Sequence, residues 1–245
     1  MAIGTLDPSQ RTAARIAGFT FIFAMVIVVV ANYGINFRLI IPNDAVETAR
    51  NIMANETLFR INIACDVIYL LNILVLLSAL YVILKPVSRN LSLIAAFCRL
   101  LLAVMWGVIA LNSLGALRIL GDAAFLPVFA TDQLQTLARL NLASSFDAYY
   151  VGLPFWGLAS TVCSCLWFKS RYVPRTLAAF GVISSLWCVY CAFAFIAVPH
   201  FDTMVHPGWY DVPMVLFEMT LGVWLLIRGL RPPGAAEQSQ DQATP

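Results

Sequence analysis

Six apolar segments, each close to the length that crosses a lipid bilayer, constrain the fold of this chain more than any other feature. A transmembrane helix needs about 20 consecutive, mostly apolar residues. Lipid leaves every backbone polar group to be satisfied within the protein, which favours helices over open strands. The pattern therefore predicts an all-α, polytopic membrane helix bundle with six transmembrane helices. The six segments are residues 13–33, 61–84, 91–115, 146–168, 175–198 and 212–230.

Composition agrees with a membrane protein and argues against a nucleic-acid-binding protein. Hydrophobic residues make up 61% of the 245 residues and charged residues only 11%, whereas a soluble domain carries about 25% charged residues. The net charge is only +2, and no basic patch is interleaved with aromatic residues, so we expect no nucleic-acid partner. The lipid bilayer is the expected partner, and nothing in the sequence specifies an oligomeric state.

Basic residues cluster in the connections on one side of the predicted bundle. Cytoplasmic loops of membrane proteins are enriched in Lys and Arg, so both termini are predicted to be cytoplasmic. Residues 1–232 then form one membrane-embedded domain, and the polar residues 233–245 a disordered cytoplasmic tail. The clustered basic residues are Arg11, Arg15, Lys85, Arg89, Lys169, Arg171, Arg175, Arg228 and Arg231.

The loops on the opposite, outer side are longer and predict two short amphipathic helices. Residues 36–60 contain Asn43 as a candidate helix cap. One face there carries Val46, Ala49, Ile52 and Met53. Residues 118–145 contain the second predicted helix, at 131–142. Short inner turns and long outer loops favour contact with a ligand from outside, although these segments could equally cover helix ends.

Four stretches resemble a known family. They are ARIAG (14–18), LFRINIACD (58–66), ALYVILKPV (79–87) and KSRYVPR (169–175), the last being the most specific. They resemble bacterial integral membrane proteins grouped as domain of unknown function 4386, over roughly residues 14–230. The resemblance implies a location in the bacterial cytoplasmic (inner) membrane. It implies no activity, so function has to be inferred from individual residues.

Arg99 stands in the middle of the third segment. It follows Arg89 by ten residues, which places it roughly 15 Å deep in a hydrocarbon core about 30 Å thick. An unpaired charge there costs at least about 2.5–3.5 kcal/mol, so Arg99 is predicted to face the protein interior and to have a partner. Small and polar residues share its helix face. They are Ser92, Ala96, Ala103, Trp106, Ala110 and Ser113.

Two acids lie at a compatible depth for Arg99. Asp66 and Glu218 are each predicted roughly 5 Å outside its level, and Asn72 is the next candidate partner. Two carboxylates against one arginine leave a surplus acid, which is either protonated or awaits a cation.

Other polar side chains gather at the same depth. Asn62, Asp66 and Tyr69 share one face of the second segment, and Asp147 and Tyr150 lie near the outer end of the fourth. They indicate either a buried ion network that fixes helix registry or a polar cavity that holds a ligand. Asp147 and Tyr150 also fit an interfacial aromatic belt. The candidate ligand-binding residues are Asn62, Asp66, Tyr69, Arg99, Asp147, Tyr150 and Glu218.

Metal, cofactor and disulfide signals are weak. His200, Asp202 and His206 lie in the last outer loop, but their spacing fits no zinc motif. No Walker loop or dinucleotide-binding turn is present, so neither a metal nor a cofactor is predicted. All six cysteines lie in the spans and are interpreted as small apolar fillers. They are Cys65, Cys98, Cys163, Cys165, Cys188 and Cys191.

Three functions follow as hypotheses, with no catalytic residue assigned. The first is binding or transport of a small or lipidic molecule through an outward-facing polar cavity. The second is an intramembrane metal-dependent hydrolase or transferase using Asp66, Asp147, His200, Asp202 and His206. The third is a non-catalytic membrane assembly partner. A cavity lined by Asp66, Arg99 and Glu218 favours the first, and convergence of histidines and acids on one point favours the second.

Overall fold

The computed structural model describes residues 6–121, 128–199, 201–205 and 208–232, and it is helical with no strand in those ranges. The all-α prediction is therefore confirmed, while residues 233–245 lie outside the described part. The helices are α1 (Pro8–Val28), the π-helix η1 (Val29–Asn36), α2 (Phe37–Leu39), α3 (Ala45–Ala54), α4 (Glu56–Leu84), α5 (Arg89–Leu120), α6 (Thr131–Ser170), α7 (Arg175–Ala197), α8 (Phe201–Met204) and α9 (Gly208–Ile227).

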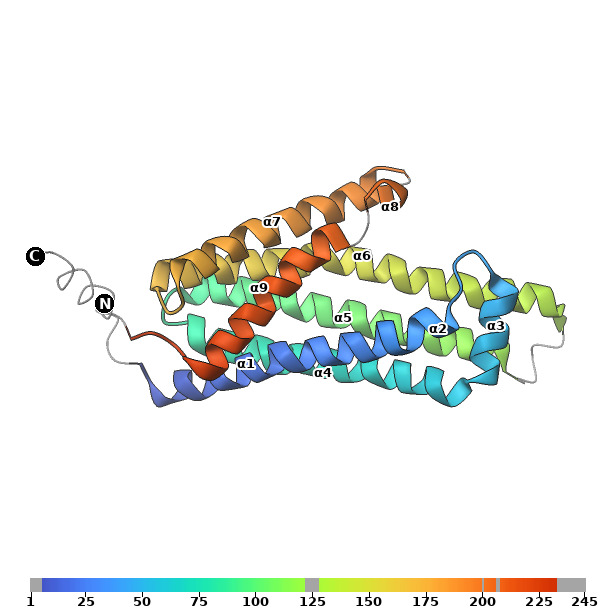
Figure 1. The fold of residues 1–245 in the computed structure, drawn as a ribbon, viewed down its shortest axis with the longest axis horizontal. Helices are drawn as coiled ribbons and strands as arrows, with labels where there is room; N and C mark the ends of the chain where they lie inside the picture. The colour runs from blue at the N-terminus through green and yellow to red at the C-terminus, as the bar shows by residue number, and fades with distance from the viewer. Residues whose placement is uncertain (1–5, 122–127, 200, 206–207, 233–245) are drawn as a thin grey trace, which may run out of the picture.

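Five stretches of the described chain are long and apolar enough to cross a membrane. They are Pro8–Leu39, α4, α5, α6 and α7, so the membrane class is confirmed. Helix α9 has 20 residues and occupies the region of the sixth predicted span. Helix α1 begins and α9 ends at the same end of the bundle (Figure 1). This arrangement is compatible with six spans and two cytoplasmic termini, which stay predictions.

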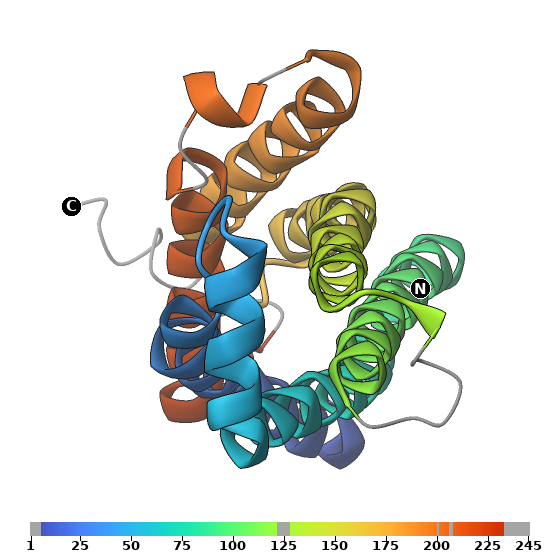
Figure 2. The same ribbon diagram turned by 90° about the vertical axis from the view of Figure 1, so that its right-hand side faces the viewer.

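The long helices form a ring in which each packs against two neighbours. Going round, α1 contacts α4, α4 contacts α5, α5 contacts α6, α6 contacts α7, α7 contacts α9, and α9 returns to α1. Figure 2 shows this arrangement end-on, with α3 lying in front of the ring. Side chains that reach across the ring therefore decide what its centre contains.

Glycines permit the closest approaches in the ring. A Cβ atom on Gly18 of α1 would lie 2.8 Å from the carbonyl oxygen of Gly222 on α9. A Cβ on Gly181 of α7 would lie 2.4 Å from the ring of Phe217. Small residues let helix backbones pack closely in membranes, and here they bring α9 against both α1 and α7.

The inner end of the bundle, near the α4–α5 and α6–α7 turns, is an apolar core. Ile83, Leu84, Trp167, Tyr172 and Leu225 belong to one buried cluster there. Tyr172 comes from the KSRYVPR stretch, and its carbonyl oxygen accepts a 2.9 Å hydrogen bond from the Arg231 backbone. That stretch therefore forms the packed turn between α6 and α7.

The cap of α3 differs by one residue from the prediction. The Asp44 side chain, not that of Asn43, accepts the Glu47 backbone N–H at 2.8 Å. Asn43 has φ 62°, a left-handed conformation that asparagine tolerates well, so it forms the turn before the cap. Val46 and Met53 are exposed, whereas α3 buries Thr48, Ala49 and Ile52. Helix α3 packs on α6.

The helix predicted at 131–142 is not separate from the fourth span. Residues 131–170 form the single helix α6, because no glycine or proline occurs between 131 and 151 to end it. Ala138 and Leu142 are buried in a cluster with Ile52 of α3. At 40 residues, α6 is about 60 Å long and extends well beyond a hydrocarbon core of about 30 Å.

Candidate functional site

Arg99 is buried in the middle of the ring and paired. It is 3% exposed, and its Nη2 lies 3.0 Å from Glu218 Oε1. The pair joins α5 to α9, which are not neighbours in the ring. A buried charge in a membrane interior needs such a partner, and the predicted Arg99–Glu218 pairing is confirmed.

The same Glu218 oxygen accepts hydrogen bonds from α6. Trp156 Nε1 donates to Oε1 at 2.9 Å, and Ser160 Oγ donates at 3.0 Å. Ser160 Oγ also lies 3.3 Å from Arg99 Nη2 and accepts from it. We call Arg99, Trp156, Ser160 and Glu218 the polar layer. Hydrogen bonds to an ionised group are stronger than neutral ones, so this layer ties three helices across the ring.

A second polar contact joins α6 and α9 further toward the outer end. The Tyr149 hydroxyl lies 2.8 Å from both Asp211 carboxylate oxygens. Tyr149 precedes Trp156 by seven residues, as Asp211 precedes Glu218. Residues seven apart share a helix face, so two helices running in the same direction meet at both levels. The sequence analysis missed Trp156 and Ser160 as partners, and this matched spacing was the signal for Trp156.

Two predicted partners of Arg99 do not contact it. Asp66 forms no ion pair or hydrogen bond with any residue that the structure describes, and Asn72 Nδ2 instead donates to the Thr20 carbonyl at 3.1 Å. Side chains lean toward the N-terminus of their helix. On the antiparallel helices α5 and α4, Arg99 therefore leans inward and the short Asp66 side chain leans outward. Glu218 is one methylene longer and lies close enough to reach Arg99.

Asn62, Asp66 and Tyr69 are buried or partly buried on α4, and we call them the α4 polar stripe. Asn62 is 2% exposed and Asp66 is 4% exposed. Asn62 Oδ1 has no hydrogen-bond partner in the described chain. The Tyr69 ring packs on Trp106 of α5 with centroids 4.3 Å apart. The stripe therefore faces the ring interior.

The backbone beside this stripe is irregular. Two hydrogen bonds set the antiparallel register of α1 and α4: Asn72 to the Thr20 carbonyl, and Gln10 Nε2 to the Ile83 carbonyl at 3.1 Å. Continued outward, this register places the π-helix η1 alongside the part of α4 that carries Asn62. Helix η1 contacts α4. π-helical segments inside α-helices occur frequently at functional sites.

Asp147 and Tyr150 are not part of the buried polar set. Asp147 is exposed. The Tyr150 ring stacks on Phe195 of α7, with centroids 3.9 Å apart, and contacts Tyr149 edge-on. Tyr150 therefore contributes to α6–α7 packing, and the described contacts do not bring either residue to the α4 polar stripe.

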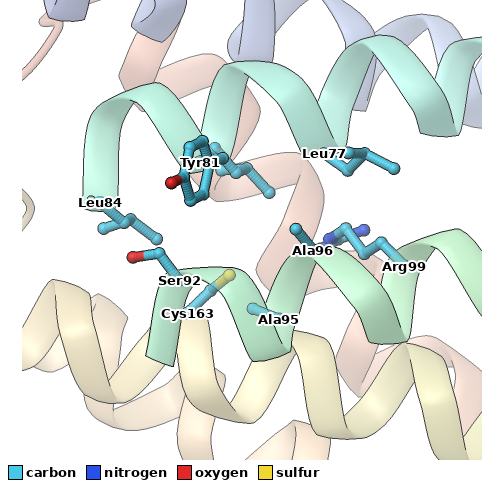
Figure 3. A pocket seen from close by; sticks show the side chains of 9 residues that line it. Leu77, Tyr81, Leu84, Ser92, Ala95, Ala96, Arg99 and Cys163 are labelled. Carbon is cyan, nitrogen blue, oxygen red and sulfur yellow. The ribbon is translucent and has the colours of Figure 1, made fainter. Parts of the chain in front are cut away.

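A cavity of about 10 Å³ lies on the inner side of Arg99, between α4, α5 and α6 (Figure 3). Leu77, Ala96 and Cys163 line it together with Arg99, whose Nε atom has no partner among the described residues. That volume holds about one water molecule. Inward of the polar layer, this cavity has no space for a larger ligand.

Metal and thiol chemistry find no support in the described residues. No group of three or more His, Cys, Asp or Glu side chains could hold a metal ion there. His200, His206 and the Asp202 side chain lie outside the described part, so their predicted site is not addressed. All six cysteines are free, and Cys163, Cys188 and Cys191 are buried.

Comparison with known proteins places most of the chain in one family. The model of a family described as a domain of unknown function (DUF4386) matches residues 16–229. No curated protein and no solved structure matches the chain.

Proposed function

For this chain, which belongs to the DUF4386 family, we propose a function in binding a small or lipidic molecule within the membrane. The molecule is held between α4, α5, α6 and α9, on the outer side of the polar layer. We further propose that the protein crosses the cytoplasmic membrane six times, with α9 as the sixth span and both termini inside. The ligand then arrives from the outer solution or the outer leaflet.

The observation that carries this proposal is the α4 polar stripe. Asn62 and Asp66 are almost completely buried, yet the Asn62 carbonyl and the Asp66 carboxylate make no hydrogen bond within the described chain. Burying such groups without partners costs several kcal/mol, and each unsatisfied buried polar group needs an explanation such as bound water or a ligand. Asn62 and Asp66 lie about one helical turn apart on the same face of α4, so their side-chain oxygens form a pair of hydrogen-bond acceptors.

The polar layer gives the proposed chamber a floor. Arg99, Trp156 and Ser160 all bind Glu218, so the Glu218 carboxylate is held by protein groups and does not need the ligand. Inward of them lies the small cavity at Leu77 and Cys163, which holds about one water molecule. The geometry therefore supports binding from one side. Movement of the ligand across the membrane would require the layer to separate.

Cysteine labelling tests whether a small molecule reaches the α4 polar stripe. We propose Asn62→Cys in a variant whose six native cysteines are replaced, held in right-side-out membrane vesicles. The probes are two membrane-impermeant methanethiosulfonates, one bearing a trimethylammonium group and one a sulfonate. We expect at least one of them to modify position 62, because the chamber is connected to the outer side.

Two control positions define the scale of this experiment. Ala130→Cys is exposed at the start of α6 and should react fully, whereas Ile73→Cys is 2% exposed on α4 and should not react. If neither reagent modifies position 62 while position 130 reacts, the proposed chamber is closed and dry. That result would favour the assembly role over ligand binding.

A further inference from the structure

We propose that the ligand of this chamber carries an organic ammonium group, bound by the Asp66 carboxylate and by the faces of Tyr69 and Trp106. The proposal rests on the proposed function and specifies its ligand class. Such a group occurs both in lipid headgroups and in free amines.

The charges around the chamber are predominantly negative. Asp66 is a buried acid of α4, and Asp211 and Glu218 are partly buried acids of α9, whereas Arg99 is the one fully buried base in the described chain. Arg99 is paired with Glu218, and Asp211 binds the Tyr149 hydroxyl. Of these three acids, Asp66 alone has neither a counter-charge nor a hydrogen bond within the described chain, and a low-dielectric interior strengthens its field. A cationic ligand would supply the positive charge that Asp66 lacks.

Aromatic rings from three helices gather inward of Asp66, in the part of the ring around Ile73. Tyr69 of α4, Trp106 of α5 and Trp156 of α6 all pack against the same buried cluster of Ile73, Leu102 and Ala103. Tyr69 is three residues, nearly one helical turn, from Asp66. The indole N–H of Trp156 is bound to Glu218, which fixes the orientation of its ring. A cation over an aromatic face is attracted by the ring, and aromatic cages of this kind recognise organic ammonium groups.

Other ligand charges fit these residues less well. A Ca²⁺ or Mg²⁺ ion takes about six or more oxygen ligands, and no group of three acidic, His or Cys side chains converges in the described chain. An anion would meet the uncompensated Asp66, and the nearest base, Arg99, is already bound to Glu218 and Ser160. An ammonium group needs one carboxylate and apolar or aromatic walls, which is what α4 and α5 offer.

The two methanethiosulfonates that test access also measure the sign of the field. In the Asn62→Cys variant, we expect the cationic reagent to react faster than the anionic one, after each rate is normalised to Ala130→Cys. Adding Asp66→Asn should lower this cation-to-anion ratio at least about tenfold, because a full charge near the thiol is removed. Asp147→Asn removes the same charge from an exposed position of α6 and should leave the ratio unchanged.

The outcomes separate the two proposals. If neither reagent reacts at position 62, the proposal of a chamber is wrong. If both reagents react and Asp66→Asn does not change the cation-to-anion ratio of their rates, the chamber is supported and the ammonium ligand is contradicted. Monodisperse elution of each purified variant in gel filtration confirms that the compared proteins are folded.

A protection assay then identifies the source of the ammonium group. Position 62 is labelled with the neutral reagent methyl methanethiosulfonate in lipid nanodiscs. Slower labelling in phosphatidylethanolamine than in phosphatidylglycerol nanodiscs assigns a lipid headgroup. Slowing by dissolved choline or ethanolamine in phosphatidylglycerol assigns a free amine. Slowing by sodium chloride alone, or by none of these probes, contradicts an ammonium site.

Discussion

The inner and outer halves of the bundle treat buried polar groups differently. In the inner half, large side chains such as Trp167, Tyr172 and Leu225 fill the ring, and the groups without partners are neutral, such as the Trp167 and Trp224 indole N–H atoms. In the outer half, the Asp66 carboxylate is buried without a protein partner. A neutral buried donor costs about 1–3 kcal/mol, and a charged group costs more.

This difference separates structural from functional burial in the molecule. A tightly packed core accepts a few unsatisfied neutral groups because packing offsets them. The unpaired Asp66 carboxylate inside the ring contributes no such packing, and its burial carries a desolvation cost. The inner half therefore holds the helices together, and the outer half is the part adapted to bind something. The predictions below alter one half or the boundary between them.

The largest effect is expected at the polar layer, where Arg99→Leu removes the cation that faces Glu218. Breaking a buried ion pair by removing one partner costs about 3–5 kcal/mol of unfolding free energy. Equilibrium unfolding of the detergent-solubilised protein measures the loss. The double variant Arg99→Met with Glu218→Gln, which leaves no buried charge, should recover much of it. Equal stability of Arg99→Leu and the natural protein would show that the layer is not a structural boundary.

The inner half should respond to packing rather than to charge. Gly222→Ala places a Cβ 2.9 Å from Phe21 Cβ, and overpacking of this kind costs about 1–3 kcal/mol. The unfolding free energy should fall, with α1 and α9 separating first. Gly34→Ala is the matched control, because its Cβ meets its nearest atom at 3.9 Å. If both variants are equally stable, the α1–α9 contact is looser than described.

The hydrogen bond between Tyr149 of α6 and Asp211 of α9 should contribute less to stability than the Arg99–Glu218 pair. Tyr149→Phe removes the hydroxyl that lies 2.8 Å from both Asp211 oxygens and keeps the ring. A hydrogen bond to a charged group contributes about 1.5–3 kcal/mol. We expect the free energy of unfolding to fall by an amount within that range, which lowers the melting temperature measured by thermal unfolding. Tyr33→Phe, on an exposed ring of η1, should not change it. A Tyr149→Phe protein as stable as the natural one would mean that the Asp211 carboxylate is held by other groups.

The smallest expected effect is a gain, not a loss, of unfolding free energy. Asp66→Asn replaces an uncompensated buried carboxylate with a neutral group of the same shape. We expect the ligand-free protein to gain about 1 kcal/mol of stability, because less desolvation energy is lost, while ammonium binding is lost. Thermal unfolding with and without choline measures both effects. Destabilisation by Asp66→Asn in the absence of ligand would show that the carboxylate has a structural partner.

Much of the fold followed from physics that is local in sequence. Apolar segments long enough to cross a bilayer predicted the long helices, and the depth of Arg99 predicted a buried partner, which is Glu218. The boundaries of 131–142 could not be predicted, because an amphipathic stretch ends as a separate helix only if something interrupts it. No glycine or proline does so before α6 enters the bundle.

The partner choices within the site were harder to predict because they depend on helix rotation and tilt. Depth alone made Asp66 and Glu218 equivalent partners for Arg99, whereas the arrangement of α9 across the ring selects Glu218. Trp156 and Ser160 read as ordinary apolar and small residues in a span. The seven-residue spacing shared with Asp211 and Glu218 was a signal for Trp156, whereas the role of Ser160 emerges only when α6 and α9 are placed in the same ring. The burial of Asn62, Asp66 and Tyr69 on one inner face was predictable, since it follows from helical spacing.

The central claim is that the Asp66 carboxylate faces a ligand or water rather than protein. An experimental density map of the natural protein in lipid nanodiscs, at a resolution that shows ordered waters, tests it directly. We predict non-protein density within hydrogen-bond distance of Asp66, beside the packed Tyr69 and Trp106 rings. A map in which a side chain or backbone N–H of this protein occupies that position, with no space for another molecule, would contradict the account.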